Sequence, residues 1–381
     1  METRKGAIDI HHHERKLEGE LESFKNDTRI LAENKETLVR YITDRRTGRR
    51  ERRHRVEKAS TGRCRKLLTV LRRFAVWLDV PFDEMTGDTI EAFILGIEDG
   101  IIGQLTRARR GQPYSPSTIS DFKRLLRIFV KYLYPQDPQK VQDLVGWFDM
   151  KAAAPEPKAL DPRLIPGLAR SMNSIQGEAY VWCSFDAGTR VAETLNLRLC
   201  DVRFERHDER LICVIDVTVS KTFARTIAMP LAAEAMRFWI MRHPAVSGIA
   251  ADGTIETSQP EATVFTWSYN SIRKRLRRAG EAELSHSVHP HMLRHTSATY
   301  WSTRLNSVMF RLRMGWSVTS EQPNRYVRRR GYLDDESARA VIGHDGHAVR
   351  TSDRDPIATG EQTEQPDGRS ALLYHTQGGM R

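Results

Sequence analysis

The sequence predicts a mostly α-helical protein of two domains, with a small antiparallel β-sheet in the second. Three observations support this fold class. Apolar residues recur at helical spacing over most of the chain, β-branched runs gather at 211–219 and 225–229, and three prolines interrupt residues 151–162. With 381 residues, of which 39% are hydrophobic, the chain is long enough for two packed cores.

The first 150 residues carry a succession of helix signals. Residues 14–42 are helix-prone and heavily charged, and we expect a charged N-terminal segment at 1–28 ahead of a helical domain at 29–150. Thr86 is placed to cap one helix, and Ser115 followed by Pro116 is typical of the start of another. The apolar stripes expected on these helices are Leu17, Leu21 and Phe24; Ile30, Leu31, Leu38 and Ile42; Leu67, Leu71, Phe74, Ala75 and Leu78; Ile90, Phe93, Ile94 and Ile97; and Ile119, Phe122, Leu126, Phe129 and Leu133.

Two basic groups in this half could meet phosphates. Seven arginines between positions 45 and 55 repel one another unless an anion relieves them, but a solvated linker explains them equally well. A second group on the helical domain could face a nucleic acid, although solvation is the commoner reason for a charged helix face. The first group is Arg45, Arg46, Arg49, Arg50, Arg52, Arg53 and Arg55, and the second is Arg107, Arg109, Arg110, Lys123, Arg124 and Arg127.

A proline-rich linker at 151–162 separates this half from a second domain expected at 163–331. There the β-branched runs predict antiparallel strands, with Lys221 in the second turn of the sheet. Residues 332–381 are rich in polar side chains and predict a tail that is poorly ordered.

Composition narrows the functional classes. A formal net charge of +11 makes a polyanion the first partner to consider, although a basic charge also serves solubility. The four scattered cysteines, with no Cys-x-x-Cys pair, predict reduced thiols in a cytoplasmic protein. We find no stretch with the length of a signal peptide or a membrane span, so we expect a soluble protein that is not secreted. The triplet at 11–13 has histidines but no cysteine or acidic partner at ligand spacing, and we predict no metal site.

Separate clusters in the second half hold residues that could carry chemistry. Arg190 stands at the mouth of a predicted helix with Glu193 one turn on, and an arginine held by a carboxylate offers a fixed fork to two phosphate oxygens. His291 and Arg294 stand three apart at another helix start, so both can face one ligand, and His295 follows them.

A third cluster places Trp316 ten residues before Tyr326. Each cluster alone is a weak signal, because a lone Trp or Tyr is usually core packing. Together with Lys221 they form a set suited to stabilising the anionic phosphorane that arises when a tyrosine attacks a phosphodiester, since phosphoryl transfer needs positioning and charge stabilisation.

The order of these residues resembles the pattern of tyrosine recombinases of the phage integrase family. The matching positions are Arg190, Lys221, His291 with Arg294, Trp316 and Tyr326, and the resemblance covers roughly residues 30–330. Many bacterial members have histidine at the position of Trp316. In having tryptophan there, the sequence is most similar to the archaeal branch of the family. The resemblance implies a helical core-binding domain at 29–150 and an α+β catalytic domain at 163–331.

The resemblance also implies a mechanism. Tyr326 would attack a DNA phosphodiester to leave a 3′-phosphotyrosyl bond and a free 5′-hydroxyl, with His291 as its base. Arg190 and Arg294 would clamp the nonbridging oxygens. The indole of Trp316 would add a hydrogen bond, and Lys221 would protonate the leaving oxygen. Glu193 would orient the arginines and His295 would be structural; no cofactor or metal is implied.

The implied partners are double-stranded DNA bearing an attachment or recombination site and three further copies of the chain, because strand exchange between two duplexes needs four active sites. The setting would be the nucleoid of the cytoplasm, with no membrane, and the task would be to integrate or excise a mobile element. In this family such C-terminal tails often dock on a neighbouring protomer.

Some features depart from the pattern, and two rivals remain. The turn that bears Lys221 lacks the glycines that many family members have there. The resemblance therefore supports the assignment of Lys221 less strongly than that of Tyr326. His344 imitates a family Gly-His box but lies beyond Tyr326, and Tyr332 does not fit the motif as Tyr326 does. A DNA-binding protein of the same fold without cleavage would not need a phenol beside these cations. A relaxing enzyme of the type IB topoisomerase class would share the site without synapsis.

Overall fold

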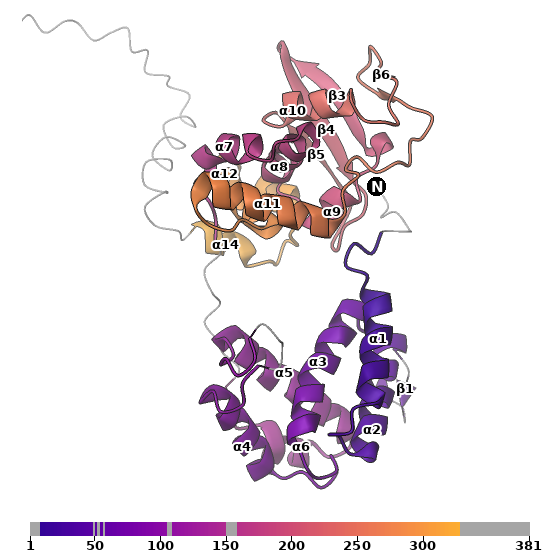
Figure 1. Cartoon of the computed structure of the whole chain (residues 1–381), viewed down its shortest axis with the longest axis vertical. Coiled ribbons are helices and arrows are strands. Elements are labelled where there is room, and N and C mark those ends of the chain that lie inside the picture. The colour runs from indigo at the N-terminus through magenta and orange to yellow at the C-terminus, as the bar shows by residue number, and fades with distance from the viewer. Residues whose placement is uncertain are drawn as a thin grey trace, which may run out of the picture. The chain divides into compact units, whose positions relative to one another are not determined.

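The computed structural model describes residues 8–48, 50–51, 54–55, 58–104, 109–149 and 158–327 (Figure 1). Several sequence predictions fall wholly or partly outside these residues. They concern part of the arginine run at 45–55, Arg107, most of the linker at 151–162, and the tail at 332–381 with Tyr332 and His344.

The N-terminal half folds into a helical body with a core of its own. Its core includes Leu17 and Phe24, two of the apolar residues expected at helical spacing in the charged N-terminal segment, and it extends to Phe148. Aromatic rings fill its centre, with Phe74 and Phe93 edge to face at 4.9 Å between centroids. The helices are α1 (His13–Lys25), α2 (Ala32–Thr47), α3 (Thr61–Trp77), α4 (Gly87–Glu98), α5 (Pro116–Leu133) and α6 (Pro138–Val145), and a short hairpin pairs β1 (Arg50–Glu51) with β2 (His54–Arg55).

The two helix starts predicted from sequence are confirmed. The Thr86 hydroxyl accepts from the Thr89 backbone N–H at 3.2 Å at the start of α4, and Thr89 reciprocates in a capping box. Ser115 accepts from the Thr118 backbone at 3.4 Å, and Pro116 occupies the first turn of α5. These local signals hold because capping satisfies backbone donors whatever the helix packs against.

The basic flank of the helical body is largely used internally. Lys123 pairs with Glu98 at 2.6 Å, and Arg124 pairs with Asp121. Arg127 donates to the carbonyl oxygens of Val145 at 2.8 Å and of Gly146 at 3.3 Å. Lys123 and Arg127 thus tie α5 to α4 and to the end of α6, whereas Arg124 pairs within α5 and stays half exposed.

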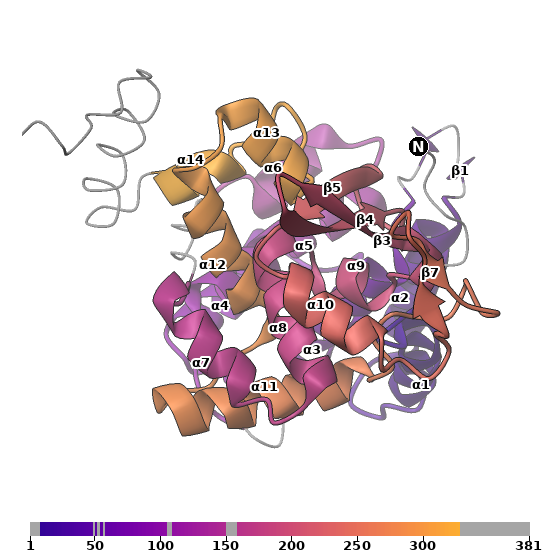
Figure 2. The same cartoon turned by 90° about the horizontal axis from the view of Figure 1, so that it is seen from above.

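The C-terminal body is built around helix α8 (Ile175–Ala187), which is buried on most of its surface (Figure 2). An antiparallel sheet in the order β3, β4, β5 lies against it, and Lys221 falls in the turn between β4 and β5. The fold class predicted from the sequence, helices with a small antiparallel sheet, is confirmed. The other elements are α7 (Ile165–Arg170), α9 (Val191–Leu195), β3 (Val202–His207), β4 (Arg210–Val217), β5 (Arg225–Met229), α10 (Ala233–Ile240), β6 (Gly248–Ile249), β7 (Ile255–Glu256), α11 (Tyr269–Leu284), α12 (Pro290–Ser302), α13 (Ser307–Met314) and α14 (Gln322–Val327), with 3-10 turns at Pro162–Leu164 and Leu199–Asp201.

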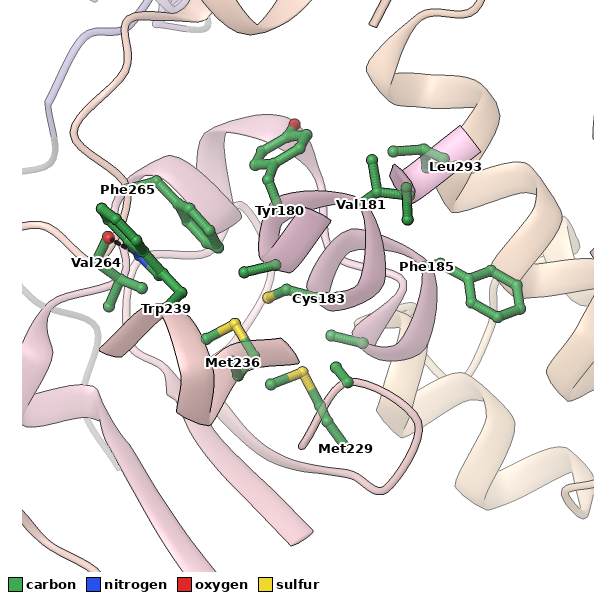
Figure 3. Close-up of a cluster of buried hydrophobic side chains, with 14 of the residues drawn as sticks. Tyr180, Val181, Cys183, Phe185, Met229, Met236, Trp239, Val264, Phe265 and Leu293 are labelled. Carbon is green, nitrogen blue, oxygen red and sulfur yellow. Dashed lines mark hydrogen bonds between the residues drawn. The ribbon is translucent and has the colours of Figure 1, made fainter. Parts of the chain in front are cut away.

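The core of this body joins α8 to the sheet and to α10 (Figure 3). Cys183 of α8 lies beside Met229 of β5 and Met236 of α10, and all three are fully buried. The indole N–H of Trp239 donates to the Val264 carbonyl at 2.8 Å, which satisfies its polar atom inside the core. This packing fixes both ends of α8, and the C-terminal end leads directly to Arg190.

A buried ion pair fastens α13 to α8. Arg313 contacts the Asp186 carboxylate at 2.6 Å, and the same carboxylate accepts the Leu231 and Ala232 backbone N–H groups. Burial raises the pKa of Asp186 to about 6 against the opposing effect of Arg313. The pair therefore sets the position of the segment that follows α13, which carries Trp316.

Among the described residues we find no helix long and apolar enough to cross a membrane. In the same part of the chain, no three His, Cys, Asp or Glu side chains are grouped so that they could hold a metal ion.

Candidate active site

The predicted site residues come from four places in the C-terminal body: the α8–α9 junction, the β4–β5 turn, helix α12 and the segment from α13 to α14. Gly188 ends α8 with a positive φ of 63°, and a Cβ there would lie 2.6 Å from the Ser297 hydroxyl oxygen. Only glycine permits this left-handed turn at such close approach. The turn places Arg190 at the N-cap of α9, as the sequence predicted.

Glu193 is the centre of the site. Its carboxylate accepts from the Arg190 side chain at 2.7 Å and the Arg190 backbone at 2.9 Å, and only 3% of its side chain is exposed. Arg225 pairs with it at 2.9 Å, and Arg294 lies 3.9 Å away. Three guanidinium groups thus surround one carboxylate, which leaves an excess of positive charge.

Arg225 is the functional side chain that the sequence analysis missed. It lies at the start of β5, is buried, and donates to the Arg313 carbonyl at 3.0 Å as well as to Glu193. It joins α9 to the end of α13. The sequence did hold one signal for Arg225, because it begins the run 225–229 that is otherwise uncharged. A buried arginine is expected only where a partner neutralises its charge.

Arg294 is buried in α12 and held by two backbone carbonyls. It donates to Gly188 at 2.6 Å and to Met314 at 2.7 Å. Burial and then the charge of Arg190 lower its pKa to about 10, so it stays charged at neutral pH. Its guanidinium lies 5.7 Å from the centroid of the Trp316 ring.

Trp316 and Tyr326 pack against each other. Their rings are stacked with centroids 5.6 Å apart, and both are buried. The preceding Gly315 has a φ of 60°, and a Cβ there would lie 2.7 Å from the Arg225 guanidinium carbon. The chain can therefore turn from α13 into Trp316 only because position 315 lacks a side chain.

The tyrosine hydroxyl has a histidine partner that differs from the expected one. His295 Nδ1 lies 2.6 Å from the Tyr326 hydroxyl oxygen. His291, expected to be the base, packs edge to face against His295 with ring centroids 4.5 Å apart and stays exposed at the rim. One helical turn separates the two histidines, so the sequence motif alone does not say which ring reaches the phenol.

The two histidines differ in environment. Burial of part of its ring and then the positive charge of Arg294 lower the pKa of His291. His295 can accept the phenolic proton at Nδ1 when its own proton is on Nε2.

Lys221 lies exposed in the β4–β5 turn, between two residues whose hydroxyls reach the site. Ser220 donates to Glu193 at 2.9 Å, and Thr222 donates to the Gly315 carbonyl at 2.9 Å. Of the residues predicted for the site, the structure therefore gathers Arg190, Glu193, Arg294, His295, Trp316 and Tyr326 by direct contact, with His291 at the rim and Lys221 on the adjoining turn.

A basic pocket of roughly 660 Å³ opens beside His291. Arg273, Lys274 and Arg277 of α11 line one wall, and His289 lies with His291 on the other. The three cationic side chains are exposed. A phosphate backbone entering this pocket would pass directly beside the site.

The buried carboxylate predicts how stability depends on pH. Although burial alone raises the pKa of Glu193, the ion pairs with Arg225 and Arg190 lower it to about 2 from an ordinary 4.5. A carboxyl group with a lowered pKa in the folded state stabilises above its unfolded value, and each unit of difference corresponds to about 1.4 kcal/mol. We expect the free energy of unfolding to fall as the pH drops from 4.5 toward 2.

Denaturant unfolding of the wild type and of Glu193→Gln between pH 7 and pH 2 measures this dependence. The amide cannot titrate, so the variant should start less stable and lose less in this window. Equal slopes for the two proteins would contradict the assignment.

The chain is similar to known proteins in sequence and in fold. Residues 162–330 match the Phage integrase family. Tyrosine recombinase XerC of Alcanivorax borkumensis is 28% identical over 196 residues, which are 50% of this chain and 61% of that protein. The chain thus matches less than two thirds of this curated relative.

Solved structures share the fold. A lambda integrase fragment (residues 75–356) bound as a dimer to a COC′ core site superposes with a TM-score of 0.53 and 15% identity, over 78% of this chain and 95% of that one. XerH recombinase bound to its difH substrate gives 0.50 and 13%, over 88% and 98%. The Tn1549 transposon integrase gives 0.50 and 16%, over 81% and 98%.

Residues 162–330 thus carry a domain that matches the Phage integrase family, and the chain shares its fold with solved integrases and recombinases.

Proposed function

We propose that this protein is a site-specific recombinase that cleaves and rejoins duplex DNA through a 3′-phosphotyrosine bond to Tyr326. The observation that supports the proposal most is the Tyr326 hydroxyl 2.6 Å from His295, beside three arginines gathered around one carboxylate. A phenol with a proton acceptor and an excess of positive charge is suited to attack a phosphodiester. We propose 29–150 as a DNA-binding domain and 163–331 as the catalytic domain.

The chemical step follows from these positions. Tyr326 Oη forms a bond to phosphorus as the bond from phosphorus to O5′ breaks, and His295 Nδ1 takes the phenolic proton. Arg190 and Arg294 neutralise the charge on the nonbridging oxygens, and Lys221 gives a proton to O5′. The phosphotyrosyl ester keeps the energy of the broken bond, so the freed 5′-hydroxyl of another strand can reverse the step without a nucleotide cofactor.

The remaining residues have supporting roles in this proposal. Glu193 holds Arg190 and Arg225, and Trp316 supports the tyrosine ring and directs its indole N–H toward the phosphate. His291 hydrogen-bonds a nonbridging oxygen from the rim. The α11 pocket beside it receives the adjoining DNA backbone.

We further propose that four copies assemble on two synapsed duplexes in the nucleoid, where they integrate or excise a mobile element. Four active sites are needed because four strands are exchanged. A binding-only protein and a relaxing enzyme of the type IB topoisomerase class are the alternative outcomes of the test below.

The test uses a nicked duplex carrying the sequence that the full-length protein enriches from a random pool of duplexes. Cleavage near the nick releases a short strand, which traps the covalent intermediate. We expect a protein band shifted by the DNA strand on a denaturing gel, with the same yield in EDTA. Binding without a shifted band would favour the binding-only alternative. A shifted band with supercoil relaxation but no joined product from two duplexes would favour the relaxing enzyme.

The choice between the two histidines gives a prediction of its own. We expect His295→Gln to slow formation of the covalent complex by about 10² to 10⁴-fold, because glutamine accepts a hydrogen bond but takes up no proton. The variant should also lose the fall in rate on acidification that a histidine base produces. Single-turnover cleavage from pH 5 to pH 9 measures both effects.

His291→Gln is the matched control, because it changes the neighbouring ring of the same helix. It should weaken cleavage but keep the acidic limb of the pH profile. If His291→Gln abolishes that limb and His295→Gln keeps it, His291 is the base and the contact at Tyr326 is structural.

A further inference from the structure

We propose that the hydroxyl groups of Ser220 and Thr222 hold the β4–β5 turn against the site and thereby position Lys221. This inference rests on the proposed function, in which Lys221 protonates the leaving oxygen. Ser220 and Thr222 are positioning residues, since they act through the lysine between them.

Within the turn itself the Thr222 backbone N–H donates to the Ser220 hydroxyl at 3.4 Å, so this local bond also runs through one of the two hydroxyls. Within the described residues 219–224, no backbone group makes a hydrogen bond to another backbone group. The sequence Ser220-Lys221-Thr222-Phe223-Ala224 also has neither glycine nor proline to define a tight turn. A connection of this kind between two strands has many accessible conformations unless side chains restrict it.

The hydroxyls of Ser220 and Thr222, the residues before and after Lys221, restrict the conformation of the turn. Ser220 donates to the buried Glu193 at 2.9 Å and accepts from Arg225 at 3.3 Å. Thr222 donates to the Gly315 carbonyl at 2.9 Å. Lys221 is therefore flanked on both sides by residues that are tied to the groups forming the site.

The anchors are themselves rigid parts of the site. Glu193 is held by Arg190 and Arg225, and Gly315 precedes Trp316, which stacks on Tyr326. A contact to each of them sets the lysine relative to the arginine cluster and to the tyrosine together. Lys221 stays exposed, and among the described residues its ammonium group has no ion-pair partner, which leaves it free for an incoming strand.

The first test separates positioning of a proton donor from general damage. We compare the wild type, Lys221→Ala and the double variant Ser220→Ala/Thr222→Val on two nicked duplexes, one with oxygen and one with sulfur at the 5′ bridging position. An alcohol leaves poorly without a proton, whereas a thiol, with an ordinary pKa near 8.5, leaves readily as the thiolate.

On the oxygen duplex we expect the double variant to cleave about 10 to 100-fold more slowly, because misplacement by about 1 Å can cost 10²-fold. On the sulfur duplex it should match the wild type within about twofold, as Lys221→Ala should. The single variant Thr222→Ser keeps the hydroxyl and should cleave the oxygen duplex at the wild-type rate. Equal slowing on both duplexes would overturn the proposal.

The second test needs no catalytic activity, so it stands even if the wild type cleaves neither duplex. Trypsin cuts after lysine, but only where the chain can enter its active site. A turn that is anchored to the body of the protein enters slowly. Brief native digestion should cut after Lys221 at least tenfold faster in the double variant than in the wild type. Cutting after Arg210, beside the exposed β3–β4 turn, is the internal control and should not change.

The outcomes distinguish the two proposals. Unchanged digestion after Lys221 in the double variant overturns the anchoring. Faster digestion together with a wild type that forms no covalent complex supports the anchoring and refutes the proposed function. If the Lys221→Ala protein also cleaves the sulfur duplex slowly, the lysine is not the proton donor.

Discussion

Tyr326→Phe is expected to abolish the covalent complex with DNA while leaving the fold intact. Phenylalanine keeps the ring that stacks on Trp316 at 5.6 Å, and it removes only the hydroxyl that contacts His295. Loss of a covalent nucleophile generally lowers the rate by roughly 10³-fold or more. The lost hydrogen bond should cost only about 1 kcal/mol of stability. Quantitative gel analysis of the trapped complex, with a thermal melt of each protein, measures both.

Tyr332→Phe is the matched control, because Tyr332 is the neighbouring tyrosine of the sequence and does not fit the motif. It should form the complex at the wild-type level. If the shifted band remains in Tyr326→Phe and disappears in Tyr332→Phe, Tyr332 is the nucleophile and the proposed site is wrong. DNA binding by Tyr326→Phe should remain, since the phenol hydroxyl is not part of the basic pocket.

The second large effect is expected from Glu193→Ala. This change removes the one carboxylate that Arg190, Arg225 and Arg294 share and leaves buried guanidinium groups without a counter-charge. Breaking a buried pair by removing one partner typically costs about 3 to 5 kcal/mol. The backbone N–H of Arg190 also loses its acceptor at the start of α9. We expect a free energy of unfolding lower by that amount and cleavage too weak to detect.

Denaturant unfolding at pH 7 checks the stability effect. Glu205→Ala is the control, because its carboxylate pairs with Arg203 at 2.8 Å but about a third of its side chain is exposed. Exposed pairs contribute about 0 to 1 kcal/mol, so this variant should unfold almost as the wild type does. A Glu193→Ala protein that loses less than about 1 kcal/mol would show that the arginines do not depend on this carboxylate.

Local features of the fold could be predicted from the sequence. Thr86 and Ser115 start their helices as predicted, because a cap depends on residues within one turn. The apolar stripe of α3 is buried, that of α5 is buried at Phe122, Leu126 and Phe129, and the β4–β5 hairpin forms where β-branched residues gather. In each case the deciding interactions span few residues, so their pattern is visible in the chain itself.

The partners of the basic flank were less predictable. Leu17 and Phe24 show the contrast, because helical spacing marked them as apolar positions and both belong to the core of the helical body. Lys123 and Arg127 are engaged by Glu98 and by carbonyl oxygens of a later segment. A sequence reports the charge of a side chain but not the partner that neutralises it, because that partner lies far away in the chain.

The sequence by itself determined the helical fold with its small sheet, the family resemblance and the set of residues Arg190, His291, Arg294, Trp316 and Tyr326 that carries it. Only the tertiary structure decided that His295 lies on the tyrosine hydroxyl, that Arg225 completes the cluster around Glu193, and that Ser220 and Thr222 anchor the turn of Lys221. These contacts join residues 27 to 93 positions apart. Motif spacing describes one helix or turn, whereas the contact of two such elements depends on how the whole core packs.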